Sequence, residues 1–309
     1  MSARHEPVLV AEVLRHLRNG PGLYLDATLG DGGHAEALLD AEPGARLLGC
    51  DRDPLALAGA RTRLGRFGDR VTTAQATFRE VPEARAALDA EPFTGALFDL
   101  GLSSMQIDEP SRGMSFMREG PLDLRMDPER GEPAWMRLAA TGEDDLVAVL
   151  REHGDLHEGG RRLARAIIAA AERGDLPTTR ALADLVDRVL GGRPHPRRTA
   201  RVFQALRIWI NDEAGELEAA LAWLPDAMKP GGVVVTLAYH SGEDRRIKQG
   251  LRGGKGTTPR RIHRLLPVRP PEGPWQELTR RVVTPSAEEQ AANPRARSAR
   301  LRAFRRKLT

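Results

Sequence analysis

Two short segments near the start of the chain combine the residue types that bind a nucleoside. Residues 24–34 read Tyr-Leu-Asp-Ala-Thr-Leu-Gly-Asp-Gly-Gly-His, and residues 47–53 read Leu-Leu-Gly-Cys-Asp-Arg-Asp. In this pattern a glycine turn follows one apolar run, and a carboxylate follows the next apolar run about twenty residues later. Such a pattern is typical of a nucleotide-cradling loop and its ribose-binding acid. We therefore expect a nucleoside-containing cofactor at the first crossover of a parallel sheet.

The choice of cofactor depends on the acid ahead of the glycines. The turn that starts at Gly30 also fits the dinucleotide pattern G-x-G-x-x-G/A, which alone is a weak signal. Asp26 favours S-adenosylmethionine, because a carboxylate there accepts from an ammonium group but repels a pyrophosphate. Asp51 is expected to bind the ribose, whereas Asp53 caps the helix that follows. The predicted cofactor-binding residues of the two segments are Asp26, Gly30, Gly32, Gly33, His34 and Asp51.

Polar residues also follow the fourth predicted strand. Ligands of an open α/β sheet bind beyond the carboxyl ends of its strands, so Asp99, Ser103, Ser104 and Gln106 are expected to lie near a methyl acceptor. A carboxylate or hydroxyl that accepts from the N–H of an exocyclic base amine favours a pyramidal nitrogen and later takes the proton. Because methyl transfer is an in-line displacement, positioning supplies much of its catalysis.

Two further residues limit which kind of catalysis and which methyl acceptor are expected. His240 follows the fifth predicted strand, where substrate contact or a loop role is favoured over a nucleophilic pair with Ser241, since neighbours on an extended chain point to opposite faces. Cys50 is the only thiol and lies inside a strand, whereas methylation at C5 of a pyrimidine needs a thiolate. An exocyclic nitrogen or an oxygen is therefore the favoured acceptor. The single cysteine also excludes a disulfide framework and a cysteine-based zinc site, and we predict no metal site.

The order of predicted elements indicates an α/β fold with a parallel, doubly wound sheet. Strands are predicted at residues 22–29, 45–51, 71–77, 95–100 and 229–239, and helices at 35–41 and 54–64. Residues 278–283 and 299–305 are expected to complete the sheet, and 250–274 to form a loop. Between the fourth and fifth strands the periodicity becomes helical, at residues 144–151, 161–173, 179–190 and 201–224, with Thr178 or Thr179 as an N-cap.

This change of rhythm divides the chain. We predict a discontinuous methyltransferase domain of residues 1–108 and 201–309, and an inserted helical subdomain of residues 109–200. Charge is uneven: residues 245–309 carry 18 Lys and Arg against 4 Asp and Glu, whereas residues 1–244 carry 29 against 39. A basic segment on an acidic body suggests a polyanionic partner. No apolar run is long enough to cross a membrane, so a cytoplasmic protein is expected.

Together these segments resemble the RsmH (also called MraW) family of methyltransferases. The segments that carry the resemblance are residues 5–9, 24–34, 99–108, 112–116, 120–127, 203–208 with Asn211, 240–245 and 293–298. The resemblance implies a Rossmann-like S-adenosylmethionine-dependent sheet with an inserted, mainly helical subdomain. It also implies methyl transfer to N4 of a cytidine in the decoding region of bacterial 16S rRNA. The alternative is another exocyclic base nitrogen in RNA or DNA.

The resemblance assigns roles residue by residue. Catalytic roles fall on Asp99 first, then on Ser103, Ser104 and His240. Cofactor contacts fall on Gly32, Gly33, His34, Asp51, Phe78, Asp99 and Gln106. The implied partner is 16S rRNA in the small ribosomal subunit or its precursor, with the basic C-terminal segment on phosphates and salt-dependent binding. Tyr239 and Gly242 depart from the family, which has Phe and Leu there. A monomer and a homodimer both remain open. A nicotinamide-dependent dehydrogenase and a non-catalytic RNA-binding factor are the rival functions.

Overall fold

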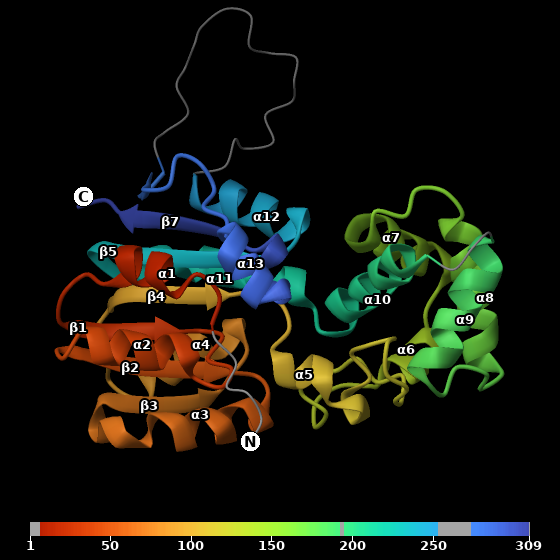
Figure 1. Cartoon of the computed structure of the whole chain (residues 1–309), viewed down its shortest axis with the longest axis horizontal. Helices are drawn as coiled ribbons and strands as arrows, with labels where there is room; N and C mark the ends of the chain where they lie inside the picture. Colours follow the sequence, from red (N-terminus) through yellow and green to blue (C-terminus); the bar gives the residue numbers. More distant parts are fainter. Residues whose placement is uncertain (1–6, 192–194, 253–272, 309) are drawn as a thin grey trace, which may run out of the picture. The chain divides into compact units, whose positions relative to one another are not determined.

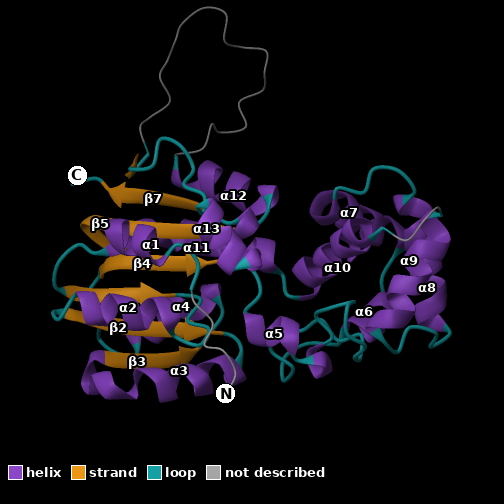
Figure 2. Cartoon of the chain, viewed as in Figure 1, coloured by secondary structure: helices purple, strands orange, loops and turns teal. Residues whose placement is uncertain are grey.

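The computed structural model describes residues 7–191, 195–252 and 273–308. The chain forms two compact units, of residues 1–101 with 216–309 and of residues 102–215 (Figure 1). The strands belong to the first unit, and the second is built from helices and loops (Figure 2). The helical unit is longer at both ends than the 109–200 expected from the sequence. Its C-terminal extension has a physical reason, since Phe203 and Leu206 pack into the core of this unit.

The sheet of the first unit has the strand order β3-β2-β1-β4-β5-β7-β6 among the described residues. The first five of these strands are parallel, β7 is antiparallel to β5, and β6 is antiparallel to β7. This confirms the predicted α/β fold with a doubly wound sheet. The strands are β1 (Gly22–Asp26), β2 (Ala45–Asp51), β3 (Val71–Gln75), β4 (Phe93–Asp99), β5 (Met228–Ala238), β6 (Trp275–Glu277) and β7 (Arg300–Arg306).

Helices cover both faces of the sheet because alternate strand residues point to opposite faces. Tyr24, Leu47 and Leu97 pack with one set of helices, whereas their chain neighbours Leu25, Leu48 and Phe98 pack with the other. The first face carries α1 (Val10–Leu17), α2 (Gly33–Ala41) and α3 (Pro54–Leu64). The second carries α4 (Val81–Ala86), α11 (Glu213–Ala227) and α12 (Ser241–Leu251). The short elements are η1 (Gly65–Arg70), η2 (Phe78–Glu80), α13 (Ala287–Ala292) and η4 (Pro294–Ser298).

Two sequence predictions were wrong. The single helix expected at 201–224 is two helices, α10 (Pro196–Ile210) and α11, because Asp212 adopts a left-handed conformation with φ 49°. No strand forms at residues 278–283, where one was expected: β6 ends at Glu277, just before them, and an isolated bridge joins Val283 to Leu301. There the hydroxyl of Thr279 accepts from the backbone N–H of Ala303 and takes the place of a ladder carbonyl. Most of the loop expected at 250–274 lies outside the described residues.

No helix in the described parts of the chain is long and apolar enough to span a bilayer.

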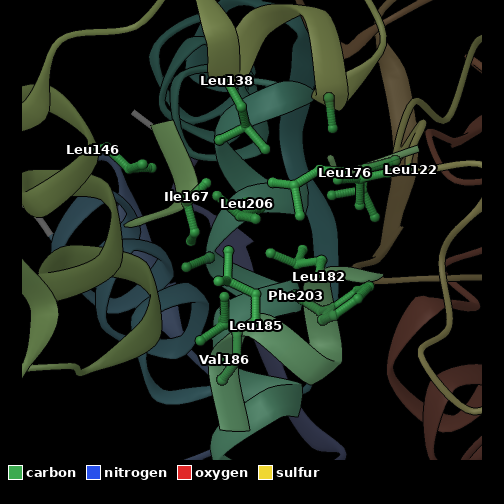
Figure 3. Close-up of a cluster of buried hydrophobic side chains, with 14 of the residues drawn as sticks. Leu122, Leu138, Leu146, Ile167, Leu176, Leu182, Leu185, Val186, Phe203 and Leu206 are labelled. Carbon is green, nitrogen blue, oxygen red and sulfur yellow. The ribbon is translucent and has the colours of Figure 1, made fainter. Parts of the chain in front are cut away.

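The helical unit has a hydrophobic core of its own (Figure 3). Leu146, Ile167, Leu182 and Leu206 come from four different helices and meet in this cluster. As predicted, Thr178 caps the helix that begins at Thr179, with its hydroxyl accepting from the N–H of Ala181. The elements of the unit are α5 (Ser104–Asp108), η3 (Pro110–Arg112), α6 (Ala134–Ala139), α7 (Glu143–Gly154), α8 (Gly160–Glu172), α9 (Thr179–Leu190) and α10.

A buried asparagine after α10 holds a strained loop of the helical unit. Leu124 has φ 63° although it is fully buried, which costs free energy for a residue with a Cβ. Asn211 compensates: its Nδ2 donates to the carbonyl of Leu124 at 2.7 Å, and its Oδ1 accepts from the N–H of Met126 at 2.8 Å. The motif of residues 120–127 thus owes its shape to a side chain more than 80 residues away in the sequence.

We expect Asn211→Ala to destabilise the helical unit by about 2–4 kcal/mol, because two buried backbone groups lose their partners. Hydrogen exchange of the amides in residues 120–130 and denaturant unfolding measure the effect. Glu158→Ala, an exposed change in the same unit, is the control and should stay within about 0.5 kcal/mol of the parent. Unchanged exchange in Asn211→Ala would contradict this role.

Candidate active site

The candidate site lies where the sheet reverses its strand order. From β1 the chain builds outward through β2 to β3, and it then returns to place β4 on the other side of β1. The loops after β1 and β4 therefore diverge, which leaves room for a ligand at the carboxyl ends of these strands. Asp26 ends β1, Asp51 ends β2 and Asp99 ends β4. The structure thus brings together three carboxylates that the sequence analysis selected separately.

The glycine turn is shaped for close approach to its surroundings. Gly32 has φ 84° and precedes the first residue of α2, where a residue with a Cβ would be strained. A Cβ on Gly33 would lie 2.4 Å from the side chain of Pro7, so the N-terminal segment packs directly on the loop. Three of the predicted loop residues, Gly30, Gly32 and Gly33, therefore form one tight turn into α2.

Asp51 and Asp53 have different structural roles, and the capping role of Asp53 is the one expected from the sequence. Asp53 accepts from the N–H of Leu55 at 3.0 Å and caps α3, which confirms that prediction. Asp51 accepts instead from the N–H groups of Gly30 at 2.8 Å and of Asp53 at 2.9 Å. It thereby ties the glycine turn to the end of β2. Burial raises the pKa of Asp51 to about 6.

Asp26 is the most deeply buried of the three carboxylates. Its side chain accepts from the N–H of Thr28 at 3.1 Å, and burial raises its pKa to about 7 even though His34 and this hydrogen bond oppose the rise. The hydroxyl of Thr28 accepts from the N–H of Asp99 at 2.7 Å and so joins the ends of β1 and β4. Sequence analysis missed Thr28, although it stands inside the motif of residues 24–34.

Asp99 is held from two sides. The hydroxyl of Tyr239 donates to Asp99 Oδ1 at 2.8 Å, and His34 Nε2 lies 3.5 Å from Asp99 Oδ2. This places His34 between two predicted site carboxylates, Asp26 and Asp99. Sequence analysis had named Tyr239 only as a departure from the family and missed its contact with Asp99.

Phe78 follows β3 and packs its apolar ring against the hydrophobic cluster on the second face of the sheet. Its ring meets Phe98 edge-on at 5.3 Å, and its carbonyl accepts from the indole N–H of Trp223 at 3.0 Å. The next residue, Arg79, donates through both backbone and side chain to the buried carboxylate of Glu216. Phe78 is therefore a fixed, half-buried ring; its predicted contact with adenine stays a prediction.

Several predicted site residues build helix caps. Ser103 accepts from the N–H of Gln106 at 3.2 Å while Gln106 Oε1 accepts from the N–H of Ser103 at 3.0 Å, which is a capping box at the start of α5. His240 and Glu243 form the same arrangement at α12. Ser103, Ser104 and Gln106 belong to the helical unit, whereas Asp99 and His240 belong to the sheet unit. The catalytic and cofactor roles of these residues stay predictions.

The charge of the site fits a cationic cofactor. Asp51 and Asp99 both act on Asp26 to raise its pKa further, so the unliganded cluster repels a pyrophosphate. His34 Nε2 is buried and has no hydrogen-bond partner among the described residues. S-adenosylmethionine carries a sulfonium and an ammonium group, which these carboxylates would stabilise, and ribose hydroxyls that suit Asp51. The described residues contain no group of three or more His, Cys, Asp and Glu side chains arranged to hold a metal ion.

A parallel sheet with an antiparallel β7 beside its last parallel strand, and with carboxylates at its switch point, is the architecture of S-adenosylmethionine-dependent methyltransferases. The model of the MraW methylase family matches residues 2–307. The chain belongs to this family, and the protein is one of these methyltransferases.

Similar proteins cover nearly the whole chain. The ribosomal RNA small subunit methyltransferase H of Sorangium cellulosum is 44% identical over 98% of this chain and 91% of that protein. The protein of the same name from Bradyrhizobium diazoefficiens is 42% identical over 99% of this chain and 92% of its own length. A solved rRNA methylase from Streptococcus thermophilus has a TM-score of 0.42 and 10% identity over 96% of this chain and 93% of that chain, too low to support an argument.

We expect the affinity for S-adenosylmethionine to rise with pH. Asp26 and Asp51 have raised pKa values of about 7 and about 6, and a bound cation favours their ionised forms. Binding near pH 5.5 must therefore release protons, and we expect a dissociation constant about tenfold weaker there than near pH 7.5. Calorimetry in two buffers of different ionisation enthalpy measures both quantities.

The matched variant is Asp26→Asn, which should bind more weakly near pH 7.5 and lose most of the pH dependence. Proton uptake on binding, or an affinity that does not change over this range, would contradict the electrostatic role of the cluster.

Proposed function

We propose that the protein transfers the methyl group of S-adenosylmethionine to N4 of a cytidine in the decoding region of bacterial 16S rRNA. The observation that carries this proposal is the carboxylate of Asp99, held at the end of β4 between Tyr239 and His34. Membership of the MraW methylase family supports it, as do relatives named ribosomal RNA small subunit methyltransferase H.

In this reaction the chain mainly orients the acceptor. The cofactor supplies an electrophilic methyl group on a sulfonium. Asp99 accepts a hydrogen bond from the N4 amino group and turns the nitrogen lone pair toward that methyl carbon. Methyl transfer would form the N–C bond as the C–S bond breaks, and the proton that the amino group loses would pass by way of the Asp99 carboxylate to water. Asp26 and Asp51 hold the cofactor through its charge and its ribose, so that the reacting centres stay in line.

The thiol inventory supports nitrogen over carbon as the acceptor. Cys50 is the only cysteine of the chain, and it is fully buried in β2. Burial raises the pKa of its thiol to about 12, so it stays protonated at neutral pH. A covalent thiolate addition to C6 of a pyrimidine, which methylation at C5 requires, has no nucleophile here.

The C-terminal segment has two kinds of arginine. Arg302 is buried and pairs with Asp244 at 2.5 Å, and Arg252 pairs with Glu277, so both serve the fold of the sheet unit. Arg295 and Arg297 are exposed in η4. This segment leads directly into Arg300, which lies opposite Ala238 at the carboxyl end of β5. We assign Arg295 and Arg297 to contacts with rRNA phosphates near the site.

The remaining assignments follow from this function. The helical unit recognises the RNA around the target cytidine, and the protein acts in the cytoplasm on the small ribosomal subunit or its precursor. The cytidine must leave its stack to reach Asp99, as in other enzymes that modify a base.

The proposal is tested by methyl transfer from labelled S-adenosylmethionine to small ribosomal subunits isolated from a strain that lacks this gene. Nucleoside analysis should give labelled N4-methylcytidine. Asp99→Ala should lower the rate roughly 100-fold or more, because the acceptor loses its orienting carboxylate. Asp69→Ala, which removes an exposed carboxylate of the same unit, should leave the rate unchanged.

Label in a different nucleoside would replace the target and support methylation of another exocyclic nitrogen in RNA or DNA. Cofactor binding without labelled nucleic acid would refute the substrate class and favour a non-catalytic RNA-binding factor.

Binding of 16S rRNA should depend on salt through the exposed arginines. Arg295→Gln combined with Arg297→Gln should reduce the slope of log K against log salt concentration by about 2, since two phosphate contacts are lost. Arg305→Gln is the control, because Arg305 is exposed on β7 opposite Val233, away from the carboxyl ends of the parallel strands. An equal change in the control, or no change in the double variant, would contradict the assignment.

A further inference from the structure

The contact between Tyr239 and Asp99 joins residues that are 140 positions apart in the sequence. Tyr239 follows β5, Asp99 ends the neighbouring strand β4, and the tyrosine hydroxyl donates to Asp99 Oδ1 at 2.8 Å. This hydrogen bond to a carboxylate is of the stronger, charge-assisted kind. It engages one oxygen of Asp99 and leaves Oδ2 on the side of His34.

The tyrosine ring is itself fixed. Gly101 has φ 106°, and a Cβ there would lie 3.3 Å from the ring, so the chain after β4 passes directly beside it. On the other side the backbone N–H of Tyr239 donates to Glu243 Oε2 at 2.8 Å. A ring held by its own backbone and by a glycine presents its hydroxyl in one place. Little ordering is then needed when substrate binds.

The hydroxyl also has one protonation state. Burial first, and then the charge of Asp99, raises the pKa of Tyr239 far above its usual range, so the phenol stays protonated over the working pH of an enzyme. The titratable groups around the pair are Asp26 at the end of β1, His34 on α2, Glu243 on α12 and Glu289 on α13. Tyr239 is therefore a constant donor to Asp99 and has no role as a base.

We infer that Tyr239 is a positioning residue for methyl transfer: its hydroxyl fixes the Asp99 carboxylate so that Oδ2 is the oxygen that accepts from the acceptor's amino group. This inference rests on the proposed role of Asp99 in orienting the acceptor, and it concerns this chain in particular, because the family has Phe at the position of Tyr239. The hydroxyl acts through Asp99 and needs no contact with the substrate.

The test is Tyr239→Phe, which removes the hydroxyl and keeps the ring beside Gly101. We expect kcat to fall about tenfold, because a hydrogen bond to a charged group is lost, while KM for S-adenosylmethionine stays within about twofold. Rates are compared on whichever nucleoside the parent enzyme labels, so a wrong target leaves this comparison intact.

A second measurement is independent of turnover. In protein labelled with ¹³C at the aspartate carboxyl groups, the signal lost in Asp99→Asn belongs to Asp99. Its chemical shift should change in Tyr239→Phe, because the carboxylate loses the hydrogen bond from the tyrosine hydroxyl. The chain contains one other tyrosine, Tyr24, whose hydroxyl donates to the carbonyl of Gly20. Tyr24→Phe is the matched control and should change neither kcat nor the Asp99 signal.

Three results would overturn the inference. An unmoved Asp99 signal in Tyr239→Phe would show that the hydroxyl does not act on the carboxylate. A loss confined to KM for S-adenosylmethionine would assign Tyr239 to cofactor binding. An equal fall of kcat in Tyr24→Phe would reduce the effect to a general loss of stability.

Discussion

The main constraint on the structure is the free-energy cost of burying carboxylates close together at one end of a parallel sheet. Asp26, Asp51 and Asp99 end three strands around the switch point, and burial raises the pKa of the first two by several units. Every donor near them offsets part of that cost: the N–H groups of the glycine turn, Thr28 and the Tyr239 hydroxyl. A cationic cofactor bound beside these carboxylates, as proposed, would offset the rest of the cost. Affinity for that cofactor and the shape of the loop thus have one physical origin.

Sequence alone predicted those parts of the molecule that depend on local patterns. The strands of the sheet, the turn at Gly30–Gly33 and the cap at Asp53 follow from apolar runs, glycine spacing and Asp-Pro, and each signal lies within a few residues of its effect. The same locality created ambiguity: Ser103-x-x-Gln106 and His240-x-x-Glu243 have the form of capping boxes, and the structure places them in that role. A residue that caps a helix after a strand can also be catalytic. Sequence spacing therefore cannot distinguish a capping role from a catalytic role.

Contacts between distant segments were beyond the sequence. Asn211 restrains the loop at Leu124, Glu216 anchors Arg79, and Tyr239 binds Asp99, each across more than 80 residues. Charge counting could not distinguish individual arginines for a related reason, since the sum over residues 245–309 treats Arg302 and Arg295 alike. One is buried against Asp244 and the other is exposed. The break between α10 and α11 was missed because Asp212 takes a conformation that its residue type permits but does not demand.

The position of β7 in the sheet has a consequence for how the protein folds during its synthesis. β7 lies between β5 and β6 and supplies six registered pairs to β5, yet it is the last described strand to be synthesised. Until it leaves the ribosome, β5 presents a bare, apolar edge to which any extended chain can add. A newly made molecule therefore passes through a stage in which the five parallel strands exist but β7 does not yet pair with the edge of β5. We expect chaperone dependence and misassembly to concentrate at that stage.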